Sequence, residues 1–358
     1  MRPTIMEINI DKFNKNIDKI EKYVGNKVIM PVIKANAYGT YINKNLDVIN
    51  RFDIVAVAII DEAIELRKLG YEKEIFILNQ PYYEDIKNII EYNITIGVSD
   101  INFLKKILNV NDSIKIHIEI ETGMNRTGVK IKDLDKFINK IKLNKNIVVE
   151  GCYTHLSSAD YDEDYTNNQL KIFKEAVNII KGNFDTIKYI HSSASNGILN
   201  GYDDISNTVR PGIIIYGYPS FENALDKINV EPICILKTKI IFIKEVDKGE
   251  SIGYSRKFVA ENNMKIATIP IGYADGLNRK LSNNGEVVIN NKKAKILGNI
   301  CMDSCMIDVT NIKDINIGTD VYIWDNKIQT LEDIANKCDT IIYEILSTIS
   351  YRVSRKFN

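Results

Sequence analysis

Short apolar runs recur along the first two thirds of the chain, and most are followed by a stretch of helical periodicity. Eight such runs lie at about 28–34, 53–59, 74–79, 94–98, 114–120, 147–154, 186–191 and 208–215. Apolar residues three and four positions apart, as in Gln169–Ile180, are typical of one buried helix face. Alternating strands and helices predict a parallel sheet with right-handed crossovers, and eight units predict a closed (β/α)8 barrel. A doubly wound open sheet is the alternative, but no G-x-G-x-x-G follows the first strand.

The pattern of apolar and polar residues changes from about Glu231 onward. Short strand-like runs separated by turn residues replace the long helices, which predicts a mostly antiparallel β domain. These runs are Ile233–Leu236, Ile240–Ile243, Ile266–Ile271, Val287–Ile289 and Val321–Ile323, before a helix at Leu331–Ala335. We therefore expect a barrel domain over 1–230 and a β domain over 231–358, with a first strand at 3–10 that packs on the second domain.

Charge and cysteine content narrow the class of function. The chain of 358 residues has 47 basic and 47 acidic side chains, so no net field favours nucleic acid or an anionic membrane. Five scattered cysteines fit neither a disulfide framework nor a zinc ribbon, and the three histidines have no metal-ligand spacing. With no apolar leader or spanning segment, we expect a cytoplasmic protein without a metal that acts on small molecules.

Reactive side chains follow the predicted barrel strands, where barrel enzymes place their active sites. Lys34 ends the run Val32-Ile33 and precedes a glycine-containing turn. A lysine there can be desolvated enough to become a nucleophile toward an aldehyde. The other strand ends carry Glu121–Arg126, Thr154-His155, His191–Ser195 and Arg210–Ile213. A lysine with a serine-rich turn and free backbone N–H groups suits an aldehyde bearing a phosphate, which implies pyridoxal 5'-phosphate.

Six segments in order along the chain resemble those of the bacterial alanine racemases. They are Pro31–Gly39, Thr122–Gly128, Gly253–Arg256, Ile269–Gly276, Gly298–Asp303 and Ile349–Arg352. The resemblance covers essentially the whole chain and implies interconversion of L- and D-alanine, which supplies D-alanine for peptidoglycan. It implies that Lys34 holds the cofactor covalently and acts as one base, with Tyr254 as the other. Two bases on opposite faces satisfy the geometry of racemisation.

The resemblance also assigns the remaining groups around the cofactor and substrate. Tyr254 and Met302 would come from the partner subunit of a homodimer. The phosphate would be held by Tyr38, Ser195, Tyr351 and the backbone at Gly212 and Ile213, with Arg210 against the pyridine nitrogen and His155 beside it. Arg126 and the Met302 amide would meet the substrate carboxylate, Asp303 would support that contact, and Tyr273 would line the entrance.

One position departs from the family pattern. Many members carry a carbamylated lysine where this chain has Glu119, and alternation along 115–121 puts Glu119 on the same face as Glu121. Its carboxylate either replaces the carbamate beside Arg126, or it is too short and contacts another inward residue or solvent.

Three other functions remain open from the sequence. A non-catalytic pyridoxal-phosphate carrier would have the barrel alone, and a basic-amino-acid decarboxylase would share the layout but not the Arg210 environment. A racemase of serine is the third, because an apolar pocket rejects one added hydroxyl by only about 10²-fold.

Overall fold

The computed structural model describes residues 2–202, 205–218 and 227–358 and divides into two compact units. One unit comprises Phe13–Ala37 and Ile42–Glu231, and the other comprises Met1–Lys12, Tyr38–Tyr41 and Pro232–Asn358. The amino-terminal strand thus belongs to the same unit as the carboxyl-terminal third of the chain.

The first unit is a parallel barrel. Its eight strands are β2 (Val28–Ile29), β3 (Ile54–Val57), β4 (Glu74–Ile77), β5 (Thr95–Val98), β6 (Ile114–Glu121), β8 (Ile147–Tyr153), β9 (Tyr189–His191) and β10 (Thr208–Val209). Strands β3 to β9 form one sheet, β10 pairs with β2, and the bridges Val32↔Ala56 and Ala194↔Arg210 close the ring. One further strand of two residues, β7 (Val129–Lys130), pairs with β6. Each of the eight predicted runs overlaps one of these strands, which confirms the barrel.

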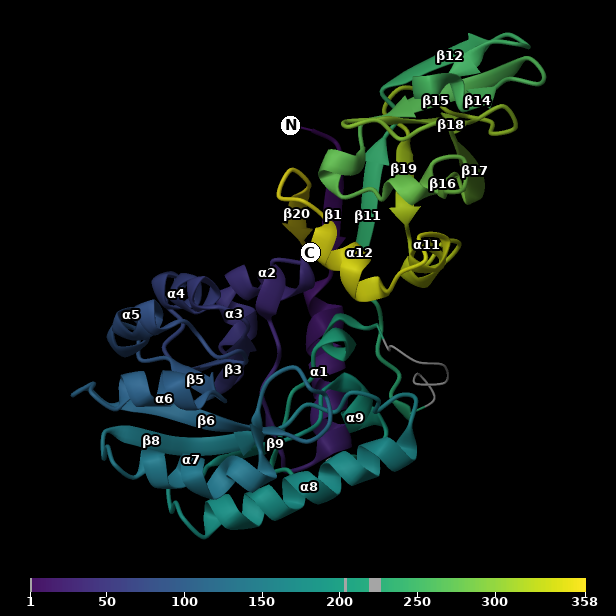
Figure 1. Cartoon of the computed structure of the whole chain (residues 1–358). Coiled ribbons are helices and arrows are strands. Elements are labelled where there is room, and N and C mark those ends of the chain that lie inside the picture. Colours follow the sequence, from purple (N-terminus) through teal and green to yellow (C-terminus); the bar gives the residue numbers. More distant parts are fainter. Residues whose placement is uncertain (1, 203–204, 219–226) are drawn as a thin grey trace. The chain divides into compact units, whose positions relative to one another are not determined.

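Helices lie on the outside of the barrel strands (Figure 1). They are α1 (Ile10–Val24), α3 (Leu46–Ile49), α4 (Ile60–Leu69), α5 (Ile86–Glu91), α6 (Ile101–Ile107), α7 (Leu134–Ile141), α8 (Glu163–Lys181) and α9 (Ser195–Leu199), with 3-10 turns η1 (Ile42–Lys44), η2 (Tyr83–Asp85) and η3 (Ile131–Asp133). Helix α8 shows why they form: the Asp162 side chain accepts from Tyr165 N at 2.9 Å, and Phe173, Val177 and Ile180 form its buried stripe.

The last predicted barrel strand is wrong beyond Val209. The run 208–215 is buried throughout, including Thr208 and Arg210, but only Thr208–Val209 is a strand. Pro211 has no N–H to donate to a sheet, and after Gly212 the chain forms the 3-10 turn η4 (Ile213–Tyr216). Apolar character alone did not distinguish a buried turn from a buried strand.

The second unit is built on a nine-stranded sheet in the order β12-β15-β18-β17-β16-β19-β11-β1-β20. Its strands are β1 (Ile5–Ile8), β11 (Cys234–Lys239), β12 (Phe242–Val246), β15 (Met264–Ile269), β16 (Glu286–Ile289), β17 (Lys292–Leu297), β18 (Cys305–Asp308), β19 (Asp320–Trp324) and β20 (Ser354–Phe357). All pairs are antiparallel except β1 with β20. The predicted antiparallel β domain is confirmed, although β17, β18 and β20 were not predicted.

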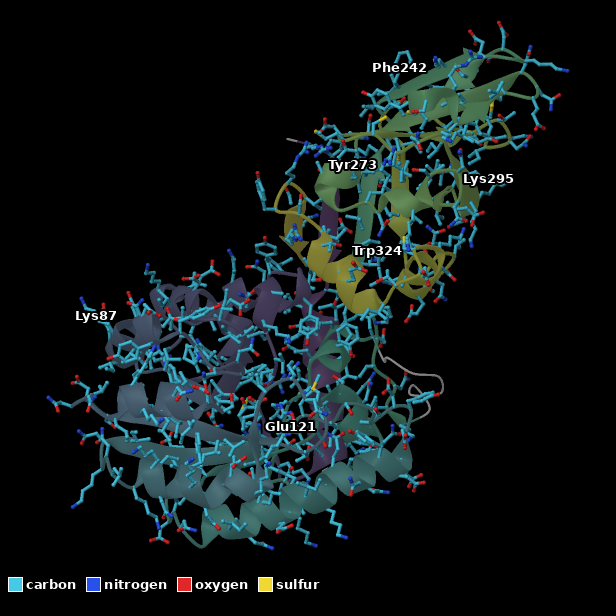
Figure 2. All side chains as sticks on the ribbon, viewed as in Figure 1. Lys87, Glu121, Phe242, Tyr273, Lys295 and Trp324 are labelled. Atoms are coloured by element: carbon cyan, nitrogen blue, oxygen red, sulfur yellow. The ribbon has the colours of Figure 1, made fainter. Side chains whose placement is uncertain are left out.

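Smaller elements complete the second unit. Strands β13 (Ser251–Ile252) and β14 (Phe258–Val259) form a hairpin whose connection contains the 3-10 turn η5 (Tyr254–Arg256). The 3-10 turns η6 (Tyr273–Asp275) and η7 (Arg279–Leu281) follow β15. Helices α11 (Leu331–Lys337) and α12 (Ile342–Thr348) follow the sheet. Trp324, marked in Figure 2, is 1% exposed and donates its indole N–H to Cys234 O at 3.2 Å. Within the part of the chain that the structure describes, no helix is long and apolar enough to cross a bilayer.

Candidate active site

Lys34 stands where the first barrel strand ends. The chain stays extended from β2 to Ile33, whose N–H donates to Ala56 O at 2.9 Å. Lys34 then opens α2 (Lys34–Tyr38), in which Ala35, Asn36 and Ala37 have φ values of 53°, 52° and 53°. Left-handed backbone costs about 1–2 kcal/mol for each residue with a side chain. The turn after Lys34 is therefore made by residues other than glycine, and surrounding contacts must hold it.

Positive charge gathers around the Lys34 ammonium. Burial lowers the pKa of Lys34, Arg126 lowers it further, Glu62 acts in the opposite direction, and Arg210 again lowers it. A lowered pKa increases the fraction of neutral amine near neutral pH, and the neutral amine is the form that can act as a nucleophile or a base. The structure thus brings Lys34, Arg126 and Arg210 into one electrostatic site.

Arg210, directly after β10, is 1% exposed and makes several hydrogen bonds to its neighbours. Its Nη2 donates to Thr154 O and to Ser192 O, both at 2.9 Å, and lies 3.3 Å from His155 Nδ1. Its Nη1 lies 2.7 Å from His191 Nδ1. Burial lowers the pKa of Arg210 to about 10, which still leaves the guanidinium charged at neutral pH. These bonds fix the orientation of a permanent cation at the strand end.

Two further histidines extend this network into the barrel interior. His191 Nε2 lies 2.9 Å from His117 Nδ1, and both rings are 0% exposed. Because Arg210 can only donate, His191 Nδ1 must accept, so Nε2 of His191 carries its proton and donates to His117. His117 therefore has its own proton on Nε2, an atom without a hydrogen-bond partner among the described residues. The alternation along 115–121 puts His117 on the same strand face as Glu119, but it does not predict this contact, because the contact depends on the register between strands.

A glycine makes room for the inner histidine. A Cβ on Gly151 of β8 would lie 2.9 Å from His117 Cδ2 and 2.6 Å from Tyr189 O.

Burial, followed by the charge of Arg210, lowers the pKa of His117 and of His155 to about 3, and lowers that of His191 well below its ordinary value. All three imidazoles are accordingly neutral over the physiological range.

Glu119 does not accept a hydrogen bond from Arg126 in this structure. Its Oε1 accepts from Thr127 Oγ1 at 2.8 Å, and its buried Oε2 has no hydrogen-bond partner within the described residues. Burial raises the pKa of Glu119, while the Thr127 hydrogen bond and the charge of Arg126 lower it in part. Glu119 and Arg126 line a cavity of about 10 Å³ together with Thr154 and His155, which is roughly the space for one water molecule. Glu121, marked in Figure 2, ends the same strand and accepts from Gly123 N.

Ser195 and the Gly212 turn come together after β9 and β10. Ser195 Oγ accepts from Gly212 N at 3.0 Å, and both residues are buried with Ile213. The predicted phosphate-binding serine and backbone turn are therefore neighbours in the barrel unit.

The other predicted site residues belong to the second unit: Tyr38, Tyr254, Tyr273, Met302, Asp303 and Tyr351. Tyr254 is 70% exposed, Met302 52% and Tyr351 85%. Tyr38 is instead buried against the Tyr343 ring, with centroids 5.9 Å apart, and burial raises its pKa. Tyr254, Met302 and Tyr351 thus present aromatic or apolar surface on this unit.

Loops that are far apart in sequence converge around these residues. Tyr273 N donates to Cys301 O at 3.1 Å, and Ala274 N donates to Met302 O at 3.0 Å. Arg352 Nη2 donates to Asp303 Oδ1 at 2.6 Å. Asn299 Nδ2 donates to Tyr254 O at 3.0 Å. The segments carrying Tyr254, Tyr273, Met302 and Tyr351 are therefore held together in one unit.

This chain has a barrel with a desolvated lysine and a fixed arginine at its strand ends, and a β domain follows the barrel. These features are those of the two-domain barrel enzymes. Models of the alanine racemase N-terminal domain and C-terminal domain match residues 8–220 and 233–357. The chain belongs to the alanine racemase family, and it is therefore an isomerase by family.

Individual relatives are similar to this chain over nearly its full length. Alanine racemase 2 of Caldanaerobacter subterraneus subsp. tengcongensis is 39% identical, with 99% of this chain and 95% of the relative covered. The solved alanine racemase of Clostridium difficile 630 is 34% identical with a TM-score of 0.93, covering 100% of this chain and 96% of the other. That of Bacillus anthracis with bound L-Ala-P is 30% identical with a TM-score of 0.93, covering 100% and 95%.

Proposed function

We propose that this protein interconverts L- and D-alanine with pyridoxal 5'-phosphate, and so supplies D-alanine for peptidoglycan. The observation that carries the proposal is Lys34, a lysine with a lowered pKa at the end of a barrel strand, in the field of Arg126 and Arg210. Family membership and the six segments that resemble those of the family support the same activity.

The described residues fit this cofactor. Lys34, Arg126 and Arg210 concentrate positive charge at one end of the barrel, which suits a ligand with a phosphate and a substrate with a carboxylate. We assign the phosphate to Ser195 and to the backbone at Gly212 and Ile213. From the resemblance to the family, Tyr38 and Tyr351 would also contact the phosphate. When bound, the cofactor supplies electron withdrawal that acidifies the α-proton of the substrate.

Arg210 would face the pyridine nitrogen. A guanidinium that stays charged cannot accept a proton and leaves that nitrogen unprotonated, which moderates electron withdrawal. Moderate withdrawal favours prompt return of the proton to the substrate rather than transamination. His155, whose Nδ1 lies 3.3 Å from Arg210 Nη2, would orient the guanidinium and the second base.

Two bases would move the proton. Lys34 would take or return it on one face of the substrate, and the Tyr254 hydroxyl would act on the opposite face. Tyr254 is 70% exposed on the β-domain unit, where a second subunit can be reached. We therefore propose a homodimer in which Tyr254 and Met302 serve the partner's barrel.

The substrate carboxylate would be bound by Arg126 and by the Met302 amide, with Asp303 held beside that loop by Arg352. Tyr273 and Tyr351 would narrow the entrance, which favours a methyl side chain over a long cationic one. We expect a preference for alanine over lysine, and a smaller preference over serine.

The test is circular-dichroism detection of racemisation of L-alanine, L-serine and L-lysine by the purified protein. Lys34→Ala should lose both the absorbance of bound cofactor and activity, by more than about 10⁴-fold. The matched control is Lys68→Ala, an exposed lysine on α4, which should retain both. Release of CO2 from lysine in place of racemisation of alanine would contradict the proposal and favour a decarboxylase.

A further inference from the structure

The left-handed turn after Lys34 is held by a carboxylate from another helix. Glu62, on the first turn of α4, accepts from Ala35 N at 2.6 Å through Oε1. Its Oε2 accepts from Ala58 N at 2.8 Å and is 3.4 Å from Ile59 N. One side chain therefore binds backbone N–H groups from two separate βα loops.

These two loops follow neighbouring barrel strands. Val32 bridges to Ala56, so the chain before Lys34 and the chain before Ala58 run side by side. The Glu62 carboxylate connects these two segments just beyond the Val32–Ala56 bridge, at Ala35 and Ala58. It is itself fixed, because it closes the amino-terminal turn of α4, where negative charge is favoured.

The turn needs such a partner for two reasons. Ala35, Asn36 and Ala37 all have positive φ, which residues with side chains rarely adopt in succession. The turn is closed by Ala37 N donating to Ile33 O at 2.9 Å, but the Ala35 N–H precedes that bond and needs an acceptor from elsewhere. Glu62 supplies it at the residue directly after the lysine.

We propose that Glu62 is a positioning residue that fixes where the Lys34 side chain leaves the barrel. The carboxylate keeps the turn left-handed, and the turn sets the direction of the lysine Cα–Cβ bond. The charge of Glu62 also raises the pKa of Lys34, whereas the charges of Arg126 and Arg210 lower it. The inference rests on the proposed role of Lys34 as the cofactor lysine and as a base.

The discriminating variant is Glu62→Gln in the full-length enzyme as purified. An amide has one accepting oxygen, so it cannot serve Ala35 N and Ala58 N from its two ends. The matched control is Glu65→Gln on the same helix, which removes the same charge but only an exposed ion pair with Lys44 at 2.8 Å.

The first readout is hydrogen exchange of the backbone, followed by mass spectrometry of peptides covering 35–37. We expect exchange there at least about 10-fold faster in Glu62→Gln and unchanged in Glu65→Gln. Protection equal to that of the unaltered enzyme in Glu62→Gln would overturn the proposal. So would equal acceleration in Glu65→Gln, since the effect would then be one of charge on α4 and not of the carboxylate bridge.

The second readout is steady-state kinetics with alanine. A displaced base costs rate in the transition state, so kcat and kcat/KM should fall together by about 10- to 100-fold, with KM nearly unchanged. A rise in KM alone would contradict a role through Lys34. If Lys34→Ala remained active, the proposed function would fail, whereas the exchange experiment would still decide whether Glu62 holds the turn.

Discussion

The buried histidines predict that acid destabilises this protein well above the range in which carboxylates titrate. His117 and His155 have pKa values of about 3 in the folded chain, and His191 also lies well below its ordinary value. In the unfolded chain each titrates near 6.5. Because the unfolded state binds protons first, stability is present above pH 6.5 and is lost as the pH falls toward 3.

The magnitude follows from linkage. Between pH 7.5 and 5.5 the unfolded chain takes up nearly one proton per histidine and the folded chain takes up almost none. Each histidine then costs about 1.4 kcal/mol of unfolding free energy over this interval, and the three together cost about 4 kcal/mol.

A single substitution isolates one histidine. His117→Asn keeps a polar group where Nδ1 meets His191 but cannot titrate, so its loss of unfolding free energy from pH 7.5 to 5.5 should be smaller by about 1.4 kcal/mol. Urea unfolding followed by far-UV circular dichroism, at equal protein and cofactor concentrations, measures this difference. Ile118→Val on the same strand is the control and should lose as much as the unaltered protein. Equal losses in His117→Asn and in the unaltered protein would show that His117 is not held neutral.

Two other variants test packing and charge in the barrel. Gly151→Ala puts a methyl group against His117 and should lower the free energy of unfolding by about 1–3 kcal/mol. The control Gly182→Ala, whose Cβ would have ordinary contacts at 3.4 Å, should change it by less than about 1 kcal/mol. Equal effects of the two substitutions would contradict the close packing of Gly151 against His117. Glu119→Gln removes a charge that acts on Arg126 and should raise KM for alanine modestly in degassed buffer. Added bicarbonate should change neither enzyme, and activation by bicarbonate would mean that Glu119 does not replace a carbamate.

The barrel could be predicted because parallel strands covered on both faces read as continuous apolar runs. The strand-end rule then located Lys34, His155, Ser195 and Arg210, which the structure places on one unit. The exposed tyrosines of the second unit carried no such signal in their local pattern. They were reached only through the resemblance to the family.

Contacts between distant segments could not be predicted. The left-handed turn has no glycine at Ala35, Asn36 or Ala37, so local sequence favoured an ordinary turn at Gly39. Glu62 had a local signal, since an acidic residue three positions into a helix closes its first turn. Its bond to Ala35 depends on how two strands lie side by side, which periodicity within one segment does not specify.

The central claim is that Lys34 and Tyr254 serve opposite faces of the substrate. The most direct test is exchange of the α-proton in D2O by Tyr254→Phe, measured separately for each enantiomer by NMR, with the exposed Tyr161→Phe as control. Racemisation should fall in both directions, because its equilibrium constant is one. D-alanine should still exchange its α-proton through Lys34, whereas exchange from L-alanine should fall by about 10²-fold or more. Equal exchange from both enantiomers in Tyr254→Phe would contradict the account.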